Sequence, residues 1–153
     1  MVRRIYIDTS VFGGYFDKEF DEDTIKFFEK VINDKITIIV SDTVTTELKT
    51  APDKVRAFYN SIPQDIIKEV PLTDEIKELA NKYILAKVLS EKHLADCRHI
   101  AAAIIYNADI VVSWNFKHLV NLERKTGYNS VNIKEGYKII DIVTPKEVFI
   151  YDN

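Results

Sequence analysis

The sequence predicts an α/β protein with a mostly parallel central β-sheet. Short runs of β-branched and aliphatic residues alternate along the chain with longer segments of helical periodicity. The run Ile36–Val40 is apolar almost throughout, which is typical of a strand buried on both faces of a parallel sheet. The 153 residues suit one core, and no linker, repeat or low-complexity tract divides them. We therefore expect residues 1–153 to form a single α/β domain.

The first half of the chain favours three strands and three helices. A strand at 3–8 opens the chain, and a helix follows at 21–33 with Ile25, Phe28 and Ile32 on one stripe. Three acidic residues at 21–23 suit the N-terminal end of that helix. The segment 41–43 offers N-cap residues for a helix that carries Glu47. A helix from 52 to 59 and a short strand at 66–70 complete this half.

The second half favours two longer helices and two more strands. Thr73 is a suitable N-cap for a helix over 73–90, and the segment 94–107 is rich in alanine and isoleucine, which indicates a largely buried helix. A hydrophobic strand is expected at 109–113. A polar, helix-tolerant stretch then runs to Gly127, and a late strand is expected at 137–141.

Composition limits the compartment and the class of partner. The formal net charge of −3 argues against a module that binds nucleic acid mainly through its phosphates, and it suits an enzyme whose acidic site is completed by cations. Cys97 is the one cysteine, so no internal disulfide is expected, and a reducing cytoplasm is indicated. The apolar runs are too short to span a membrane.

Three acidic residues and one amide fall where a parallel sheet places its functional groups. Asp8 ends the first strand, and Glu47 lies on the helix after the second. Asp96 lies in the opening turn of the alanine-rich helix, and Asn115 follows the strand that ends at Ser113. Ligands bind such sheets outside the carboxyl ends of their strands. These four side chains are therefore predicted to converge at one edge.

Carboxylates that converge repel one another, and a divalent cation removes that penalty. An all-oxygen ligand set favours Mg²⁺ or Mn²⁺ over Zn²⁺, and two such ions can clamp a phosphodiester. Each residue also has a structural interpretation. Asp8 or Asn115 could cap a turn, Glu47 could be a solvated helix residue, and Asp96 could interact with the helix dipole.

Four segments, in order along the chain, resemble the four motifs of the PIN-domain family. The resemblance covers essentially the whole chain. The segments are Asp8-Thr9-Ser10-Val11-Phe12, Thr46-Glu47-Leu48, Ala95-Asp96-Cys97-Arg98-His99-Ile100-Ala101-Ala102-Ala103 and Val112-Ser113-Trp114-Asn115-Phe116-Lys117-His118-Leu119.

PIN domains are metal-dependent nucleases with an α/β/α three-layer sandwich fold, and many are toxins of the VapC-like toxin–antitoxin type. The resemblance implies that Asp8, Glu47 and Asp96 are metal ligands and that Ser10 supports the first aspartate. Two departures stand out. Asn115 replaces a fourth acid, and His118 occupies a position where related sequences often carry an acid. Weaker binding of a second metal, or a stronger preference for Mn²⁺, would follow.

The leading interpretation is an endoribonuclease toxin that uses Mg²⁺ or Mn²⁺, with an antitoxin as partner and a homodimer through the helices at 73–90 and 94–107. The alternative is a catalytically weak PIN-like module that binds RNA or protein.

Trp114 could stack on a base or pack under a loop, and Arg98 could guide the phosphate backbone. His99 and His118 could shuttle protons, or His99 could hydrogen-bond inside the core. A haloacid-dehalogenase-like phosphohydrolase is disfavoured, because Ser10 stands where its second aspartate should be.

Overall fold

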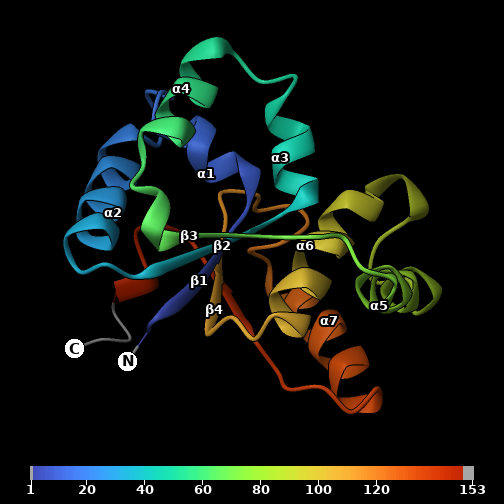
Figure 1. Cartoon of the computed structure of the whole chain (residues 1–153). Coiled ribbons are helices and arrows are strands. Elements are labelled where there is room, and N and C mark those ends of the chain that lie inside the picture. The colour runs from blue at the N-terminus through green and yellow to red at the C-terminus, as the bar shows by residue number, and fades with distance from the viewer. Residues whose placement is uncertain (1, 150–153) are drawn as a thin grey trace.

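A computed structural model describes residues 2–149 and contains a five-stranded sheet. The strand order is β3-β2-β1-β4-β5, and every neighbouring pair is parallel. The chain therefore moves outward from β1 to β3 and then crosses back to β4 and β5 (Figure 1). This arrangement confirms the expected α/β fold. The strands are β1 (Arg4–Ile7), β2 (Thr37–Ser41), β3 (Ile67–Val70), β4 (Ile110–Val112) and β5 (Asp141–Val143).

Seven α-helices cover the two faces of this sheet within the described residues. Figure 1 shows α5, α6 and α7 gathered on one side of the sheet and α1, α2 and α4 on the other, which makes three layers. Two short 3₁₀ turns, η1 (Gln64–Ile66) and η2 (Glu91–His93), precede β3 and α6. The helices are α1 (Thr9–Gly14), α2 (Asp21–Asn33), α3 (Asp42–Leu48), α4 (Asp53–Ser61), α5 (Asp74–Leu85), α6 (Leu94–Ile105) and α7 (Leu122–Lys134).

The central strands are buried, as their continuous apolar character predicts. Ile5, Tyr6 and Ile7 of β1 are fully inaccessible to solvent, and so are Ile38 and Ile39 of β2. A strand covered on both faces has no polar side to present to water, which is why these residues do not alternate in polarity. Among residues 2–149, no helix is both long enough and apolar enough to cross a membrane.

Parallel pairing brings the carboxyl ends of the inner strands to one edge. Ile7 at the end of β1 is paired with Val112 at the end of β4, and the amide of Asp8 donates to the Val112 carbonyl at 3.1 Å. Ser41 ends β2 beside them. The residues that follow these strands therefore begin the loops and helices of one rim, where the candidate site lies.

The late strand expected at 137–141 is wrong, because β5 runs from Asp141 to Val143. The side chain of Asn129, on α7, explains the shift. Its Oδ1 accepts from the amide of Ile140 at 2.9 Å, and its Nδ2 donates to the Ile140 carbonyl at 2.8 Å. Both backbone groups of Ile140 are thus taken by a helix side chain, so the strand ladder can begin only afterwards.

Two helix limits also differ from expectation. The helix expected at 73–90 ends at Leu85, because Lys87 adopts a left-handed conformation (φ 62°) and the amide of Val88 donates back to the Tyr83 carbonyl at 3.0 Å. The polar stretch to Gly127 is part of α7, which continues to Lys134. Gly127 lies inside this helix against Val88, where an added Cβ would come within 3.0 Å of that side chain.

Candidate active site

Asp8 lies at the end of β1, and its carboxylate is held by two hydroxyl groups. The residue is 5% exposed, and its Oδ2 accepts from the Ser10 and Ser113 hydroxyls, each at 2.7 Å. Asp8 is the N-cap residue of α1, but its side chain makes no capping hydrogen bond. Its carboxylate is therefore fixed across the rim by side chains from two motifs and does not serve as a helix cap.

Glu47 lies in the second turn of α3, near the end of the helix and not in its opening turn. Its Oε1 accepts from the Thr9 hydroxyl at 2.8 Å and lies 2.7 Å from His99 Nε2. The side chain retains 40% exposure, so one carboxylate oxygen is anchored while the group still faces the rim. A freely solvated helix residue would not be held from two other segments.

His99 is the fully buried centre of this network. Its Nε2 contacts Glu47 and lies 3.4 Å from Asp8 Oδ1, while its Nδ1 lies 2.7 Å from the Tyr6 hydroxyl. The Tyr6 hydroxyl lies in turn 2.8 Å from Ser41 Oγ. The expectation that His99 hydrogen-bonds inside the core is confirmed. The same ring also connects two of the acidic residues.

The surroundings of His99 and Glu47 shift both pKa values in the direction that favours the charged side chain. Burial lowers the pKa of His99, but the Tyr6 oxygen, the hydrogen bond to Glu47 and the nearby carboxylates outweigh it and hold that pKa well above its usual value. Burial raises the pKa of Glu47, but the hydrogen bond and charge of His99, with the Thr9 hydroxyl, lower it overall. A doubly protonated His99 donates from Nδ1 to Tyr6 and from Nε2 to Glu47.

Asp96 lies in the first turn of α6 and carries the opposite shift. Burial, together with the charges of Asp8 and Glu47, raises the pKa of Asp96 to about 6, although His99 lowers it. The charges of Asp8 and Glu47 thus act on Asp96, but the ligand atoms of Asp8 and Glu47 lie together with that of His99, whereas Asp96 lies with His93 and His118. A helix dipole alone would lower the pKa of a first-turn carboxyl, so burial and the crowding of negative charge dominate here.

The donor set fits a divalent cation. Asp8, Glu47 and His99 each have one potential ligand atom, and these atoms lie within 4.8 Å of one another. The two carboxylate oxygens can bind a cation directly, whereas a His99 nitrogen could bind one only after losing its proton. Part of the rise in the pKa of Asp96 reflects repulsion between carboxylates, which a cation among them would relieve. The residues present are therefore consistent with a divalent metal site.

Asn115 and Trp114 build the loop after β4. Asn115 Oδ1 accepts from the amides of Lys117 at 3.2 Å and His118 at 3.0 Å, so its oxygen closes a turn. Trp114 donates from Nε1 to the Thr24 hydroxyl at 2.9 Å. Its ring also stacks on Phe20 with centroids 4.4 Å apart. The indole therefore packs under a loop. The backbone amide of Trp114 donates to Ser10 Oγ at 3.0 Å.

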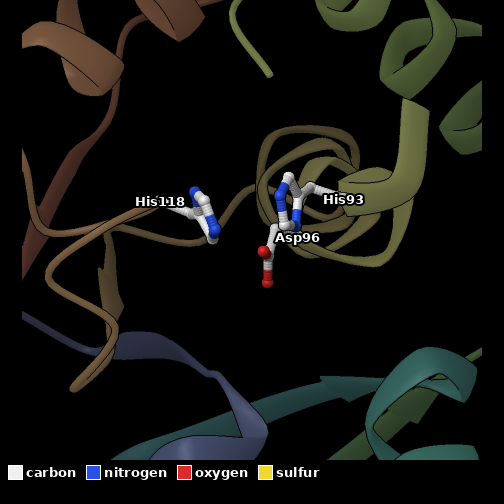
Figure 2. Close-up of side chains that lie close together, drawn as sticks. All are labelled: His93, Asp96 and His118. Atoms are coloured by element: carbon white, nitrogen blue, oxygen red, sulfur yellow. The ribbon is translucent and has the colours of Figure 1, made fainter. Parts of the chain in front are cut away.

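The remaining candidates lie beside this centre. Arg98 is half-buried on α6, and its Nε is one of two buried side-chain nitrogens without a hydrogen-bond partner in the described part of the chain. The other such atom is His118 Nδ1. The His118 ring faces His93, with ring centroids 3.9 Å apart (Figure 2). His93 belongs to none of the four motifs, so nothing in the sequence singled it out.

Sequence reasoning missed part of the network around the acids. Thr9, Ser113 and Tyr6 hold Asp8, Glu47 and His99 in place, yet hydroxyl residues beside strands are too common to single out. The sequence suggested His99 only as a proton shuttle or a core residue. The one available signal was its spacing of three from Asp96, which places both on one side of a helix.

An α/β/α sandwich with carboxylates crowded at the carboxyl edge of its parallel sheet defines a class of protein with an acidic, metal-compatible centre. The family model described as the PIN domain matches residues 5–118. The chain therefore belongs to the PIN domain family.

Solved structures show the same fold at low sequence identity. A chain of VapBC2 from Rickettsia felis bound to a promoter DNA fragment is similar with a TM-score of 0.57 and 13% identity, over 92% of this chain and 98% of that one. A chain of FitAcB from Neisseria gonorrhoeae is similar with a TM-score of 0.56 and 14% identity, over 92% of this chain and 97% of that one. A chain of FitAB bound to an IR36 DNA fragment is similar with a TM-score of 0.53 and 13% identity, over 93% of this chain and 95% of that one. No curated protein matches the chain.

Proposed function

We propose that this chain is a divalent-metal-dependent endoribonuclease that hydrolyses RNA phosphodiester bonds. The observation that carries the proposal is that ligand atoms of Asp8 and Glu47 lie within 4.8 Å of each other at one rim of the sheet, and the charges of both residues also raise the pKa of Asp96. Membership of the PIN domain family supports it. The fold alone would not, because one fold hosts many activities and function depends on the site.

Asp8, Glu47 and Asp96 would hold the cations, for which we propose Mg²⁺ or Mn²⁺ because the carboxylate oxygens are hard ligands. Bound there, a cation would neutralise phosphate charge and acidify a water molecule. Ser10 and Ser113 keep the Asp8 carboxylate oriented through their hydroxyls.

His99 and Asn115 act as positioning residues in this proposal. His99 fixes the direction of the Glu47 carboxylate from inside the core. Asn115 shapes the loop that presents Trp114 and His118. Arg98 and Trp114 remain candidates for RNA contact, Arg98 through its charge and Trp114 through the edge of a ring that is already packed.

The toxin role and its antitoxin are proposed from resemblance. The motifs resemble VapC-like toxins, and the similar folds include chains from VapBC2 and FitAB. An antitoxin segment would offer a positive group to the acidic rim, because three carboxylates there attract a guanidinium. A homodimer through α5 and α6 remains part of the same proposal.

A catalytically weak module is the second candidate. Asn115 favours it, because this amide replaces the fourth acid and its oxygen already accepts two backbone hydrogen bonds. A site with fewer charges binds a second cation less strongly.

Cleavage of a mixed single-stranded RNA pool by the purified full chain separates the two candidates. We expect cleavage with Mg²⁺ or Mn²⁺, none with EDTA, and at least a ~10–100-fold loss in Asp8→Asn, the scale on which even outer partners of metal ligands matter. Asp65→Asn makes the same chemical change on the exposed turn η1, at the opposite end of the strands, and should leave the rate unchanged. RNA left intact by the wild type with either ion would favour the binding module.

A further inference from the structure

A second group of metal-ligating side chains lies next to the acidic centre. His93, Asp96 and His118 each offer one ligand atom, and these atoms lie within 4.8 Å of one another. Figure 2 shows the three side chains close together, with His93 and Asp96 on one segment and His118 on another. The group brings together η2, α6 and the loop after β4.

The chain brings the three residues close together. His93 ends η2, and Asp96 follows three residues later in the first turn of α6, a spacing that puts both on one side of a helix. The loop that carries His118 is pinned twice. The amide of His118 donates to Asn115 Oδ1 at 3.0 Å, and the Tyr128 hydroxyl donates to the His118 carbonyl at 3.0 Å.

A second observation points to a ligand at this place. His118 Nδ1 is buried and has no hydrogen-bond partner among the described residues. Buried polar atoms are almost always paired with protein, water or an ion, so an unpaired imidazole nitrogen needs an explanation. The two hydrogen bonds to the His118 backbone hold this part of the loop in position.

We propose that His93, Asp96 and His118 bind a transition-metal ion of the Zn²⁺ type. Two imidazoles and one carboxylate suit Zn²⁺ and its neighbours, whereas the carboxylates around Asp8 suit Mg²⁺ or Mn²⁺. Three protein ligands leave a fourth position of a tetrahedral ion open. Asp96 lies in the group with the histidines, and the proposed function also assigns it to the acidic centre, so it would connect the two sites.

Both histidines, but not Asp96, line a cavity of about 500 Å³. Lys117 and Arg124 also line this cavity. The positive charges of these two side chains oppose the binding of a bare cation. They favour an anionic oxygen bound at the open position of the ion. The cavity therefore suits a phosphate-bearing ligand that reaches the ion from this side.

Zn²⁺ binding to the metal-free full chain tests the proposal without using nuclease activity. Calorimetry against a competing chelator, with the visible absorption of Co²⁺ as a second probe, should show one site in the wild type. His93→Ala and His118→Ala should each weaken Zn²⁺ binding by at least about tenfold, and His93→Gln and His118→Gln guard against loss of folding. Unchanged Zn²⁺ affinity in the folded histidine variants would overturn the proposal.

Exposed neighbours supply matched controls. Lys92→Ala and Lys117→Ala remove a charge one residue from each histidine without removing a ligand, so Zn²⁺ affinity should stay the same or increase. Weaker Zn²⁺ binding in these lysine variants would count against direct ligation by the histidines.

The result of the Zn²⁺-binding test can be distinguished from the result of the nuclease test. Asp8→Asn should retain the histidine-dependent Zn²⁺ site while losing RNA cleavage. A wild type that binds Zn²⁺ through His93 and His118 but leaves RNA intact would support the metal site and reject the nuclease.

Discussion

Asp96 is the side chain on which the charge balance of the rim depends most. It is half-buried, it interacts with the charges of Asp8 and Glu47, and it also faces His93 and His118. Its pKa of about 6 means that folding holds a proton that the unfolded chain releases near the ordinary value of 3.8. The stability of the metal-free protein should therefore fall as pH rises from about 4 through 6 and then level off.

Asp96→Asn should stabilise the metal-free protein at pH 7.5, because a neutral amide removes the repulsion felt by the ionised carboxylate. The gain should be smallest near pH 4, where the wild-type carboxyl is already protonated. Urea unfolding with EDTA at both pH values measures this difference. A variant that is less stable than the wild type at pH 7.5 would show that Asp96 is not under electrostatic strain.

His99 predicts a decline in stability at higher pH. Because the folded protein raises its pKa, the imidazolium contributes stability that is fully present below the unfolded value of 6.5 and is lost as pH rises through the folded pKa. His99→Gln should remove this decline and should also weaken cleavage about tenfold or more, since Glu47 loses its anchor.

Urea unfolding of wild type and His99→Gln between pH 6 and 9 provides the comparison. His93→Gln removes an imidazole outside the contacts with Tyr6 and Glu47 and controls for the loss of one histidine. Parallel pH profiles for wild type and His99→Gln would mean that folding does not raise the pKa of His99.

At the scale of elements, α1 and the loop after β4 support the rim together. Gly14 ends α1, and a Cβ added there would lie 2.8 Å from the Trp114 ring and 3.1 Å from Thr24 Oγ1. Trp114 in turn donates its backbone amide to Ser10, which orients Asp8. The packing of Trp114 under this loop thus influences the position of Asp8, a proposed metal ligand.

Gly14→Ala should destabilise the protein by about 1–3 kcal/mol, the usual cost of overpacking, and should lower the cleavage rate. Trp114 is the one tryptophan of the chain, so its fluorescence reports the displaced indole directly. Gly13→Ala is the matched control, since a Cβ there meets nothing within 4 Å, and alanine should stabilise the helix by about 0.5–1 kcal/mol. Equal effects of the two substitutions would remove the Trp114 explanation.

Elements with strong local signals were predictable from sequence. The helix at 21–33 begins and ends where its acidic first turn and apolar stripe place it, and the buried strands follow their apolar runs. Elements fixed by distant partners were not predictable. Asn129 of α7 binds both backbone groups of Ile140, so β5 begins one residue later. Gly127 lies inside α7 because its Cα side packs closely on Val88.

At the scale of the whole molecule, the parallel sheet converts sequence order into proximity. Asp8 and Glu47 are far apart in sequence, yet their ligand atoms lie within 4.8 Å of each other, as expected because functional groups gather at the carboxyl ends of parallel strands. The same rule says nothing about how side chains meet across that edge. The contacts of His99 and the pairing of His93 with His118 depend on three-dimensional packing, which no local sequence pattern encodes.

Anomalous diffraction from crystals soaked in Mn²⁺ tests most directly whether the acidic side chains share a cation. The account predicts a Mn²⁺ peak bound by oxygens of Asp8 and Asp96, with Glu47 turned toward it, and no such peak in Asp8→Asn crystals. Crystals that bind no Mn²⁺ between these carboxylates, with Asp8 and Asp96 facing separate surroundings, would contradict it.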